Sequence, residues 1–181
     1  VAADGLLHMP DYWSGERAFQ TLTQVAGRAG RGNRLGQVIL QTYTPEHPVV
    51  EAAKDHNYKT FIEHEIDHRK LLGYPPYGRL VLLRLTSPSE AEAEKAAKHC
   101  AEQLQTLLPQ MGEECLLDND VMGPGLLGPT PAPVFRVAKR YRWHLLLKLP
   151  LNSTVPDLTD LRAHLPKSVR LTIDIDPLNL S

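Results

Sequence analysis

Residues 24–32, with the sequence QVAGRAGRG, are the part of this chain best suited to carry out chemistry. The guanidinium groups of Arg28 and Arg31 are permanently charged, and each presents a rigid fork of N–H donors that matches the oxygens of a phosphate. A helix over residues 14–29 would place polar side chains at steps of three and four along one stripe. The members of this polar stripe are Arg17, Gln20, Gln24, Arg28 and Arg31. The stripe predicts a surface that binds phosphate.

A less specific interpretation of the same residues is a helix end. Basic side chains in a last turn offset the negative end of the helix dipole, and Gly30 or Gly32 could supply the C-cap. For a lone pair of arginines this would be the preferred interpretation. The full pattern Q-x-x-G-R-x-G-R is longer than a helix cap requires, and it therefore favours a functional site.

The pattern resembles motif VI of superfamily 2 helicases, and QVAGRAGRG is similar to the version found in the PriA family of primosomal helicases. In that family the motif lies on the second RecA-like lobe and faces ATP bound to the first lobe. The resemblance implies that Arg31 is the arginine finger and Arg28 the second phosphate-facing arginine. It also implies that Gln24 couples the nucleotide to the lobe interface. Gly27 and Gly30 would be structural parts of the nucleotide-binding site.

The resemblance extends to the segments YPPY at 74–77, RYRW at 140–143 and DIDP at 174–177. It implies the C-terminal part of an ATP-dependent 3′–5′ DNA helicase that recognises stalled or abandoned replication forks and initiates primosome assembly for replication restart. The implied cofactors are ATP and Mg²⁺. The implied partners are forked or single-stranded DNA, single-stranded-DNA-binding protein, and primosome and helicase-loading proteins, all in the cytoplasm. The zinc-binding cysteines of the family lie upstream, so no metal site is expected in this chain.

The chain lacks the other parts of an ATP site. Nothing in it matches G-x-x-x-x-G-K-[ST], the glycine-rich loop that cradles phosphates, and no acidic motif suited to magnesium follows. It also begins at Val1 without an initiator methionine. We therefore expect a fragment whose ATP site is completed by the absent first lobe, and which is inactive as an ATPase on its own.

Residues 64–68 satisfy the pattern H-E-x-x-H, which on a helix places two imidazoles on one face for zinc and a glutamate as general base. His64 and His68 would be the ligands, and Glu65 the base. A catalytic zinc site needs a third protein ligand, but Leu71 stands at the glycine position of the usual continuation H-x-x-G-x-x-H. Acidic candidates downstream, in a run typical of a solvated helix face, are Glu90, Glu92 and Glu94. A zinc metalloprotease is therefore the weaker hypothesis.

A second basic cluster lies between residues 136 and 143. Its members are Arg136, Lys139, Arg140 and Arg142, interleaved with Tyr141 and Trp143. Arginines beside aromatic rings are typical of surfaces that bind single-stranded nucleic acid, because the charges follow the backbone while the rings stack on bases. Positive charges at the edge of a sheet also discourage pairing with another sheet, and this alternative is equally compatible with the pattern. The resemblance to the PriA family favours DNA.

Strand alternation links the two kinds of residue in this cluster. If Arg140 and Arg142 face DNA, then Tyr141 and Trp143 point to the opposite side and belong to the core.

The polar stripe requires an amphipathic helix over residues 14–29. Its opposite side carries the apolar residues Phe19, Leu22, Ala26 and Ala29. A β-branched stretch at 37–42 predicts a strand that closes a parallel sheet, and helices are expected over 49–55 and 57–72. His47 could be a neighbour of the nucleotide, but a turn or capping role at the start of the first of these helices is the preferred interpretation.

The second half of the chain predicts strands and helices in the order βαββαβ. The expected ranges are strand 80–85, helix 89–108, strand 115–122, strand 141–149, helix 155–165 and strand 169–175. The segment 123–133 holds too many prolines for regular structure and is expected to be a loop. This order predicts an antiparallel sheet with both helices on one face, the ferredoxin-like arrangement.

The fold class is therefore α/β, with three parts. Residues 1–54 are expected to be the C-terminal part of a RecA-like helicase lobe, with a parallel sheet and helices. Residues 55–77 would form a connecting helix and a Pro-rich junction, and residues 78–181 a C-terminal α+β domain.

The composition narrows the class of protein. Hydrophobic residues make up 42% and charged residues 23% of the chain, and no apolar run approaches the 18 residues that a membrane span needs. The net charge of −1 predicts no general attraction to nucleic acid, so any DNA contact must be local. Two widely separated cysteines, Cys100 and Cys115, suggest neither a zinc site nor a disulfide framework, and a reducing cytosol fits them best.

A nucleic-acid-binding or scaffold module without any role for ATP is a further alternative. It would require residues 24–32 to be packed away from any cleft.

Overall fold

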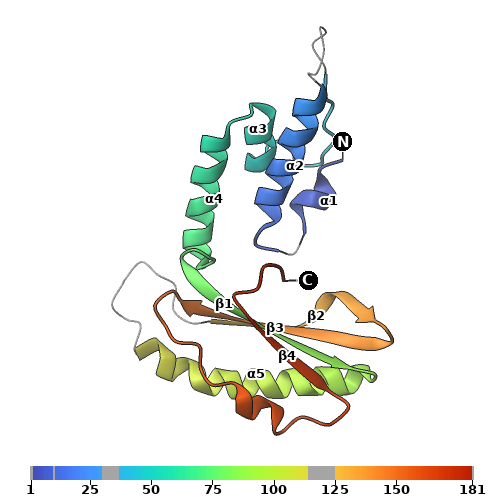
Figure 1. Ribbon diagram of the computed structural model, residues 1–181, viewed down its shortest axis with the longest axis vertical. Coiled ribbons are helices and arrows are strands. Elements are labelled where there is room, and N and C mark those ends of the chain that lie inside the picture. The colour runs from blue at the N-terminus through green and yellow to red at the C-terminus, as the bar shows by residue number, and fades with distance from the viewer. Residues whose placement is uncertain (1, 10, 30–36, 114–124, 181) are drawn as a thin grey trace. The chain divides into compact units, whose positions relative to one another are not determined.

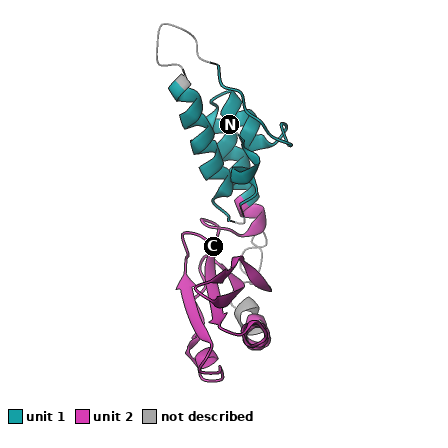
Figure 2. Cartoon of the chain, turned by 90° about the vertical axis from the view of Figure 1, so that its right-hand side faces the viewer, with its two compact units in different colours: residues 1–68 teal, residues 69–181 magenta. Residues whose placement is uncertain are grey.

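The computed structural model describes residues 2–9, 11–29, 37–113 and 125–180. It divides into two compact units, residues 1–68 and residues 69–181, so the division falls inside a helix (Figure 2). Each unit has its own hydrophobic core. None of the helices in the described ranges is both long enough and apolar enough to cross a membrane.

The first unit is built from helices. They are α1 (Asp4–Leu7), α2 (Ser14–Ala29), α3 (Pro48–Lys54) and most of α4 (Tyr58–Leu72) (Figure 1). The predicted helix over 14–29 is confirmed. Its apolar side enters the core, where the Phe19 ring stacks on the Phe61 ring of α4 at 4.4 Å between centroids. Leu22, Val49 and Val50 are buried around them.

α3 begins as predicted. Pro48 occupies its first turn, where a missing N–H costs nothing, and His47 is the N-cap. The Nδ1 atom of His47 accepts a hydrogen bond from the Val49 backbone N–H at 3.2 Å. The capping role expected for His47 is therefore confirmed.

The strand predicted over residues 37–42 is wrong for the part of the chain that is described here. Only one parallel bridge joins Ala2 to Gln41, and the Ala3 N–H donates to the Gln41 carbonyl at 3.0 Å. β-Branched residues favour a pleated surface only when neighbouring strands supply contacts, and the Ile39 side chain is 76% exposed. The parallel sheet of a RecA-like lobe is not seen among the described residues.

The second unit contains a four-stranded antiparallel sheet, as predicted. Its elements are β1 (Gly78–Ser87), α5 (Glu90–Glu113), β2 (Gly125–Val137), β3 (Arg140–Pro150), the 3₁₀ helix η1 (Thr159–Arg162) and β4 (Arg170–Ile175). The strand order is β2-β3-β1-β4, with every neighbouring pair antiparallel. α5 lies along one face of this sheet (Figure 1).

The helix predicted over 155–165 is wrong, because only the single turn of η1 forms there. Pro156 pushes the residue before it away from helical geometry, and Pro166 prevents continuation at the other end. Between the prolines, the Asp157 carboxylate accepts hydrogen bonds from the Thr159 N–H at 2.9 Å and the Thr159 hydroxyl at 2.6 Å. The ferredoxin-like arrangement is thus present with one α-helix instead of two.

The Pro-rich segment predicted to be a loop is largely the strand β2. Among the described strands, β2 lies at the edge of the sheet and pairs only with β3, so prolines can occupy positions whose N–H would point away from the partner. The pairing also slips twice, between Leu127 and Thr130 and between Pro131 and Arg136. Gly128 has φ of +97°, and a side chain there would strike the His144 carbonyl oxygen. The strand predicted over 115–122 lies outside the described residues.

Strand alternation sorts the second unit into a core face and an opposite face. Side chains that face α5 form the core, and its largest members on β1 and β3 are Val81, Leu83, Leu85, Trp143, Leu145, Leu147 and Leu149. Helix α5 contributes small residues and Leu104 to the same core. The predicted core position of Trp143 is confirmed, since its side chain is 9% exposed and belongs to this cluster. Tyr141 packs against the cluster.

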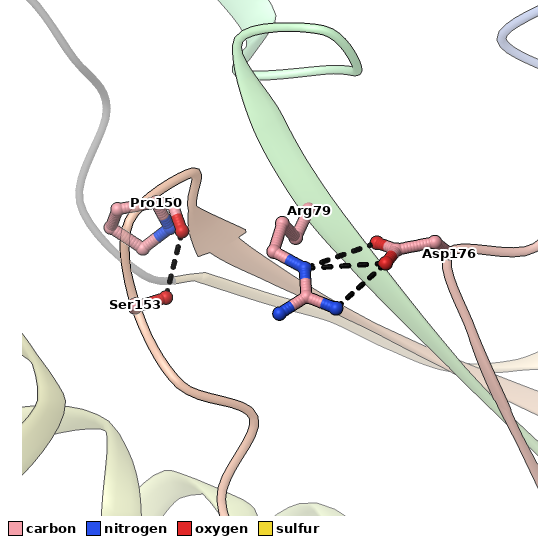
Figure 3. Close-up of polar contacts among 4 residues, drawn as sticks. All are labelled: Arg79, Pro150, Ser153 and Asp176. Atoms are coloured by element: carbon pink, nitrogen blue, oxygen red, sulfur yellow. Dashed lines mark hydrogen bonds and ion pairs between the residues drawn. The ribbon is translucent and has the colours of Figure 1, made fainter.

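An ion pair joins the segment after β4 to the beginning of β1. The Arg79 guanidinium donates to the Asp176 carboxylate, with its Nη2 atom at 2.7 Å and its Nε atom at 3.2 Å from the same oxygen (Figure 3). The Asp176 N–H donates to the Leu80 carbonyl at 2.8 Å, and Pro177 is fully buried. The segment after β4 is thereby held along the first residues of β1.

We expect Trp143→Ala to destabilise the chain by roughly 3–5 kcal/mol, because the change leaves a large cavity in the core beneath α5. Urea denaturation followed by circular dichroism measures this effect. Leu178→Ala is the matched control, since Leu178 is 79% exposed and should change the free energy of unfolding by less than about 0.5 kcal/mol. Equal stability of the two variants would show that the Trp143 ring is not part of the core.

Candidate functional site

The polar stripe of α2 has two parts: side chains that contact other residues of the same unit, and side chains that are exposed. Arg17 forms an ion pair with Asp11 at 3.2 Å, and the Gln20 amide donates to the Glu16 carboxylate at 3.5 Å. These contacts hold the first half of the stripe within its own unit. Further along, Gln24 and Arg28 are exposed, and neither has a hydrogen bond or ion pair with another described residue.

Gly27 lies between Gln24 and Arg28 in the last turns of α2. A Cβ atom built at Gly27 would have no neighbour within 4 Å among the described residues. Nothing described in this chain therefore requires glycine at this position, although glycine weakens a helix relative to alanine. The space beside Gly27 is open to a ligand or to another protein segment.

The remaining predicted residues of this site, Arg31 and Gly30, lie outside the described residues. The accessible part of the stripe thus consists of Gln24, Gly27 and Arg28. An exposed guanidinium, an exposed amide and an open glycine are compatible with a phosphate ligand.

A groove of about 510 Å³ borders the other side of α2. Its walls come from α2, the segment 38–45 and the end of α3, and they are mainly apolar. Asp4 fixes part of this segment, since its carboxylate accepts from the Thr42 hydroxyl at 2.8 Å and from the Tyr43 N–H at 3.1 Å. These bonds lower the pKa of Asp4. The groove includes neither Gln24 nor Arg28, so it is separate from the polar stripe.

The H-E-x-x-H pattern lies on α4 as predicted, but it does not assemble a metal site. His64 and His68 are exposed, whereas Glu65 is buried. The Glu65 carboxylate lies against Gly15 in the first turn of α2, where a Cβ would come within 3.0 Å of Oε2. A carboxylate is favoured there because the N-terminal end of a helix is positive. Within the described ranges, no three His, Cys, Asp or Glu side chains come close enough together to hold a metal ion.

The downstream glutamates also have other contacts. Glu94 pairs with Lys98 at 2.6 Å on α5. The Glu92 carboxylate accepts from the Ser87 hydroxyl at 2.9 Å and the Ser168 hydroxyl at 2.8 Å, and these hydrogen bonds lower the pKa of Glu92. The zinc metalloprotease hypothesis therefore has no third ligand among the described residues.

The basic cluster of residues 136–142 forms the β2–β3 hairpin, but its four members do not share a surface. Lys139 is exposed in the turn, where Ala138 and Lys139 both have positive φ. Arg136 is paired with Tyr141 across the strands, and its guanidinium lies 4.9 Å from the centre of the Tyr141 ring. Because directly paired residues share a face, Arg136 lies on the side of the sheet that carries α5.

Arg140 is committed to backbone oxygens. Its Nη2 atom donates to the Thr86 carbonyl at 2.9 Å and to the Ser168 carbonyl at 2.8 Å. These bonds join the start of β3 to the end of β1 and to the segment before β4. Arg140 therefore positions the hairpin. The residues next to Arg140 in the sequence did not indicate this structural role.

Arg142 lies on the face opposite α5, since the adjacent Trp143 is in the core. It is partly exposed and has no hydrogen bond or ion pair with another described residue. Nearby on the same face, the pKa of His144 is lowered to about 4, first by burial and then by the positive charges of Arg142 and Arg84. The His144 imidazole is therefore neutral near pH 7.

Two basic residues of this face were not included in the basic cluster that the sequence predicted. Arg84 on β1 is paired with His144 across the strands, and Arg170 at the start of β4 is paired with Thr86. The alternation at 169–175 did indicate that Arg170 points away from the core. The cross-strand register, which places Arg170 across Thr86 from Arg142, has no local signal in the sequence.

Comparisons with known proteins agree with the resemblance noted in the sequence. Replication restart protein PriA of Synechocystis sp. is 49% identical over 181 residues, covering 99% of this chain and 20% of that protein. The proteins of the same name from Bacillus subtilis and Haemophilus influenzae are 40% and 33% identical over 82% and 100% of this chain, and over 17% and 24% of their own lengths. The chain thus spans about a fifth of these relatives.

The model of the family described as "Primosomal protein N C-terminal domain" matches residues 70–178. This range begins near the end of α4 and includes the whole antiparallel sheet with α5. It covers more than half of the chain, and the chain therefore belongs to the PriA family, whose C-terminal domain it contains.

Proposed function

We propose that this chain is the C-terminal part of an ATP-dependent 3′–5′ DNA helicase that recognises stalled or abandoned replication forks and initiates primosome assembly. The observation that carries the proposal is the accessible end of α2. There Arg28, Gln24 and the open flank of Gly27 stand within the pattern QVAGRAGRG. The replication-restart name of the relatives supports the biological setting.

In this proposal Arg31 and Arg28 contact the phosphates of ATP, and Gln24 links the nucleotide to the interface between lobes. ATP supplies the phosphoryl group whose transfer drives unwinding. An arginine finger stabilises the charge that develops on that group, which requires a side chain that is always protonated. The phosphate loop and the acidic residues for Mg²⁺ would come from a first lobe, since neither motif occurs in this sequence.

We further propose that the C-terminal unit contacts forked or single-stranded DNA through its basic hairpin. Arg136, Lys139 and Arg142 would make the contacts, while Arg140 would hold the hairpin in shape through its bonds to backbone oxygens. Single-stranded-DNA-binding protein, primosome proteins and helicase loaders are the proposed protein partners, in the cytoplasm. The proposed Zn²⁺ of the complete protein would be bound by residues outside this chain.

The chain alone is expected to show no DNA-stimulated ATP hydrolysis, because it carries one side of the proposed site only. A coupled ATPase assay on the purified 181-residue chain tests this expectation. Turnover that rises with added DNA would overturn the idea of a site divided between two lobes.

In a full-length protein that carries this chain, Arg31→Ala should lower ATP turnover by roughly 10³–10⁵-fold. Nucleotide affinity should stay nearly constant, because a finger acts on charge that appears in the transition state. Arg31→Lys should restore little, since an ammonium lacks the planar fork. A variant that loses affinity but keeps its turnover number would identify Arg31 as a binding residue instead.

Gly27→Ala tests whether the open flank of α2 serves the nucleotide. In the isolated chain it should raise the free energy of unfolding by about 0.5–1 kcal/mol, because alanine is the better helix former and no described atom opposes its methyl group. In a full-length protein the same methyl group should reduce ATP turnover.

Gly15→Ala is the matched control for Gly27→Ala. It lies in the same helix, but its new methyl group would meet the Glu65 carboxylate, so no gain in stability is expected. If Gly27→Ala stabilises the helix and leaves turnover unchanged, Gly27 has no part in the nucleotide site.

A further inference from the structure

The face of the C-terminal sheet opposite α5 has two different halves. Near the start of β1 it is buried: Leu80 and Leu82 are fully inaccessible, and the Tyr74 ring lies 4.6 Å from the Lys148 ammonium. At the other end, Thr86 and the charged side chains around it are at least partly exposed. We call this second half the arginine face, and its charged members are Arg84, Arg140, Arg142, Arg170 and Asp174.

The register of the strands brings three of these arginines together. Thr86 on β1 is paired with Arg142 on β3 and with Arg170 on β4, so the two arginines flank it in one row. Strands are about 4.8 Å apart, which places the backbones of Arg142 and Arg170 about 10 Å from each other. Arg84 lies two residues along β1, on the same side of the sheet.

The charge on this face is only partly balanced. The Arg84 guanidinium lies 3.5 Å from the Asp174 carboxylate, and Arg140 is held by backbone oxygens. Arg142 and Arg170 form no ion pair or hydrogen bond with any other residue in the described ranges. Arg142 and Arg170 are thus at least partly exposed on a face whose described residues supply one carboxylate, that of Asp174.

Aromatic rings are missing from the described side chains of the arginine face. Tyr141 and Trp143 are directed to the core side, and Tyr74 lies over the buried half. Surfaces that bind single strands combine positive charge with rings on which the bases stack. A surface with guanidinium groups and no such rings can bind phosphates, and it lacks the aromatic platform that favours unpaired bases.

We propose that the arginine face binds the phosphate backbone of double-stranded DNA, with Arg142 and Arg170 as the main contacts and Arg84 beside them. This inference rests on the proposed DNA-binding function, but it moves the contact from the turn of the hairpin to the sheet. It also assigns a duplex arm, not an unpaired strand, as the ligand of this face.

The test measures the affinity of the 181-residue chain for a fluorescein-labelled blunt DNA duplex, and for one of its strands alone, at several salt concentrations. The duplex should bind more tightly than the single strand. Arg142→Gln and Arg170→Gln together should weaken duplex binding and reduce the slope of log affinity against log salt by about 0.9 for each phosphate that is no longer neutralised. Neither side chain has a described partner, so the variant should keep the wild-type circular dichroism spectrum.

Arg136→Gln combined with Lys139→Gln tests the proposed hairpin contact separately, because it removes the same charge from the turn and from the α5 side of the sheet. It should weaken duplex binding less than the first variant does, because the main duplex contacts stay in place. Weaker duplex binding by this second variant, together with unchanged duplex binding by the first variant, would overturn the arginine face and keep the proposed hairpin contact. If the unmodified chain binds neither DNA, both proposals fail.

Two further measurements test the proposal on the unmodified chain, so they do not depend on whether a variant folds. Duplex phosphates beside Arg142 should raise the pKa of His144 from its low value, since they offset the positive charges that depress it, and NMR titration of the imidazole with and without duplex reports this shift. An unchanged His144 pKa in the bound chain would place the duplex elsewhere. Poly-glutamate that competes equally with duplex would identify the face as a site for acidic protein and overturn the proposal.

Discussion

One helix, α5, covers one face of the four-stranded sheet, and the roles of the residues in the second unit follow from this constraint. Successive side chains of a strand point to opposite faces, so a residue's position in the alternation decides whether it enters the core. On β3, Trp143 and Leu145 are packed beneath α5, while Arg142 and His144 lie on the other side. Stability and charge are thus supplied by adjacent residues of one strand.

The same division appears in the first unit on α2. Phe19 and Leu22 are buried, whereas Gln24 and Arg28 are exposed near the end of the helix. Gly27 weakens the helix without relieving any clash within the described chain. The stacked rings of Phe19 and Phe61 help to offset that cost.

Local patterns predicted the long elements well. The 3.6-residue period of α2, the clean alternation of β4 and the apolar runs of β1 and β3 each reflect burial on one side or both. Prediction failed where the tertiary environment decides whether a residue type stabilises or destabilises a strand. Prolines at 129, 131 and 133 are tolerated because β2 is an edge strand, and β-branched residues at 37–42 form no strand without described neighbours to pair with.

Individual side chains show the same limit. Glu65 belongs to a pattern that suggests zinc chemistry, yet it is buried against the first turn of α2. Arg140 was grouped with a DNA-binding cluster, but its donors are directed to two carbonyl oxygens from distant parts of the chain. Such contacts join residues far apart in sequence, so no local spacing can indicate them.

The sequence by itself determined the family, the amphipathic helix that carries the pattern QVAGRAGRG, and the two-sided nature of the strands, because each depends on residue type and short-range period. Only the tertiary structure decided which charged residues act together. Arg142 and Arg170 flank Thr86 because β3 and β4 pair with the same residue of β1, and Arg136 is separated from Arg142 because the sheet lies between them. Strand order and register depend on packing across the whole unit, and this is the physical reason that the sequence pattern left them open.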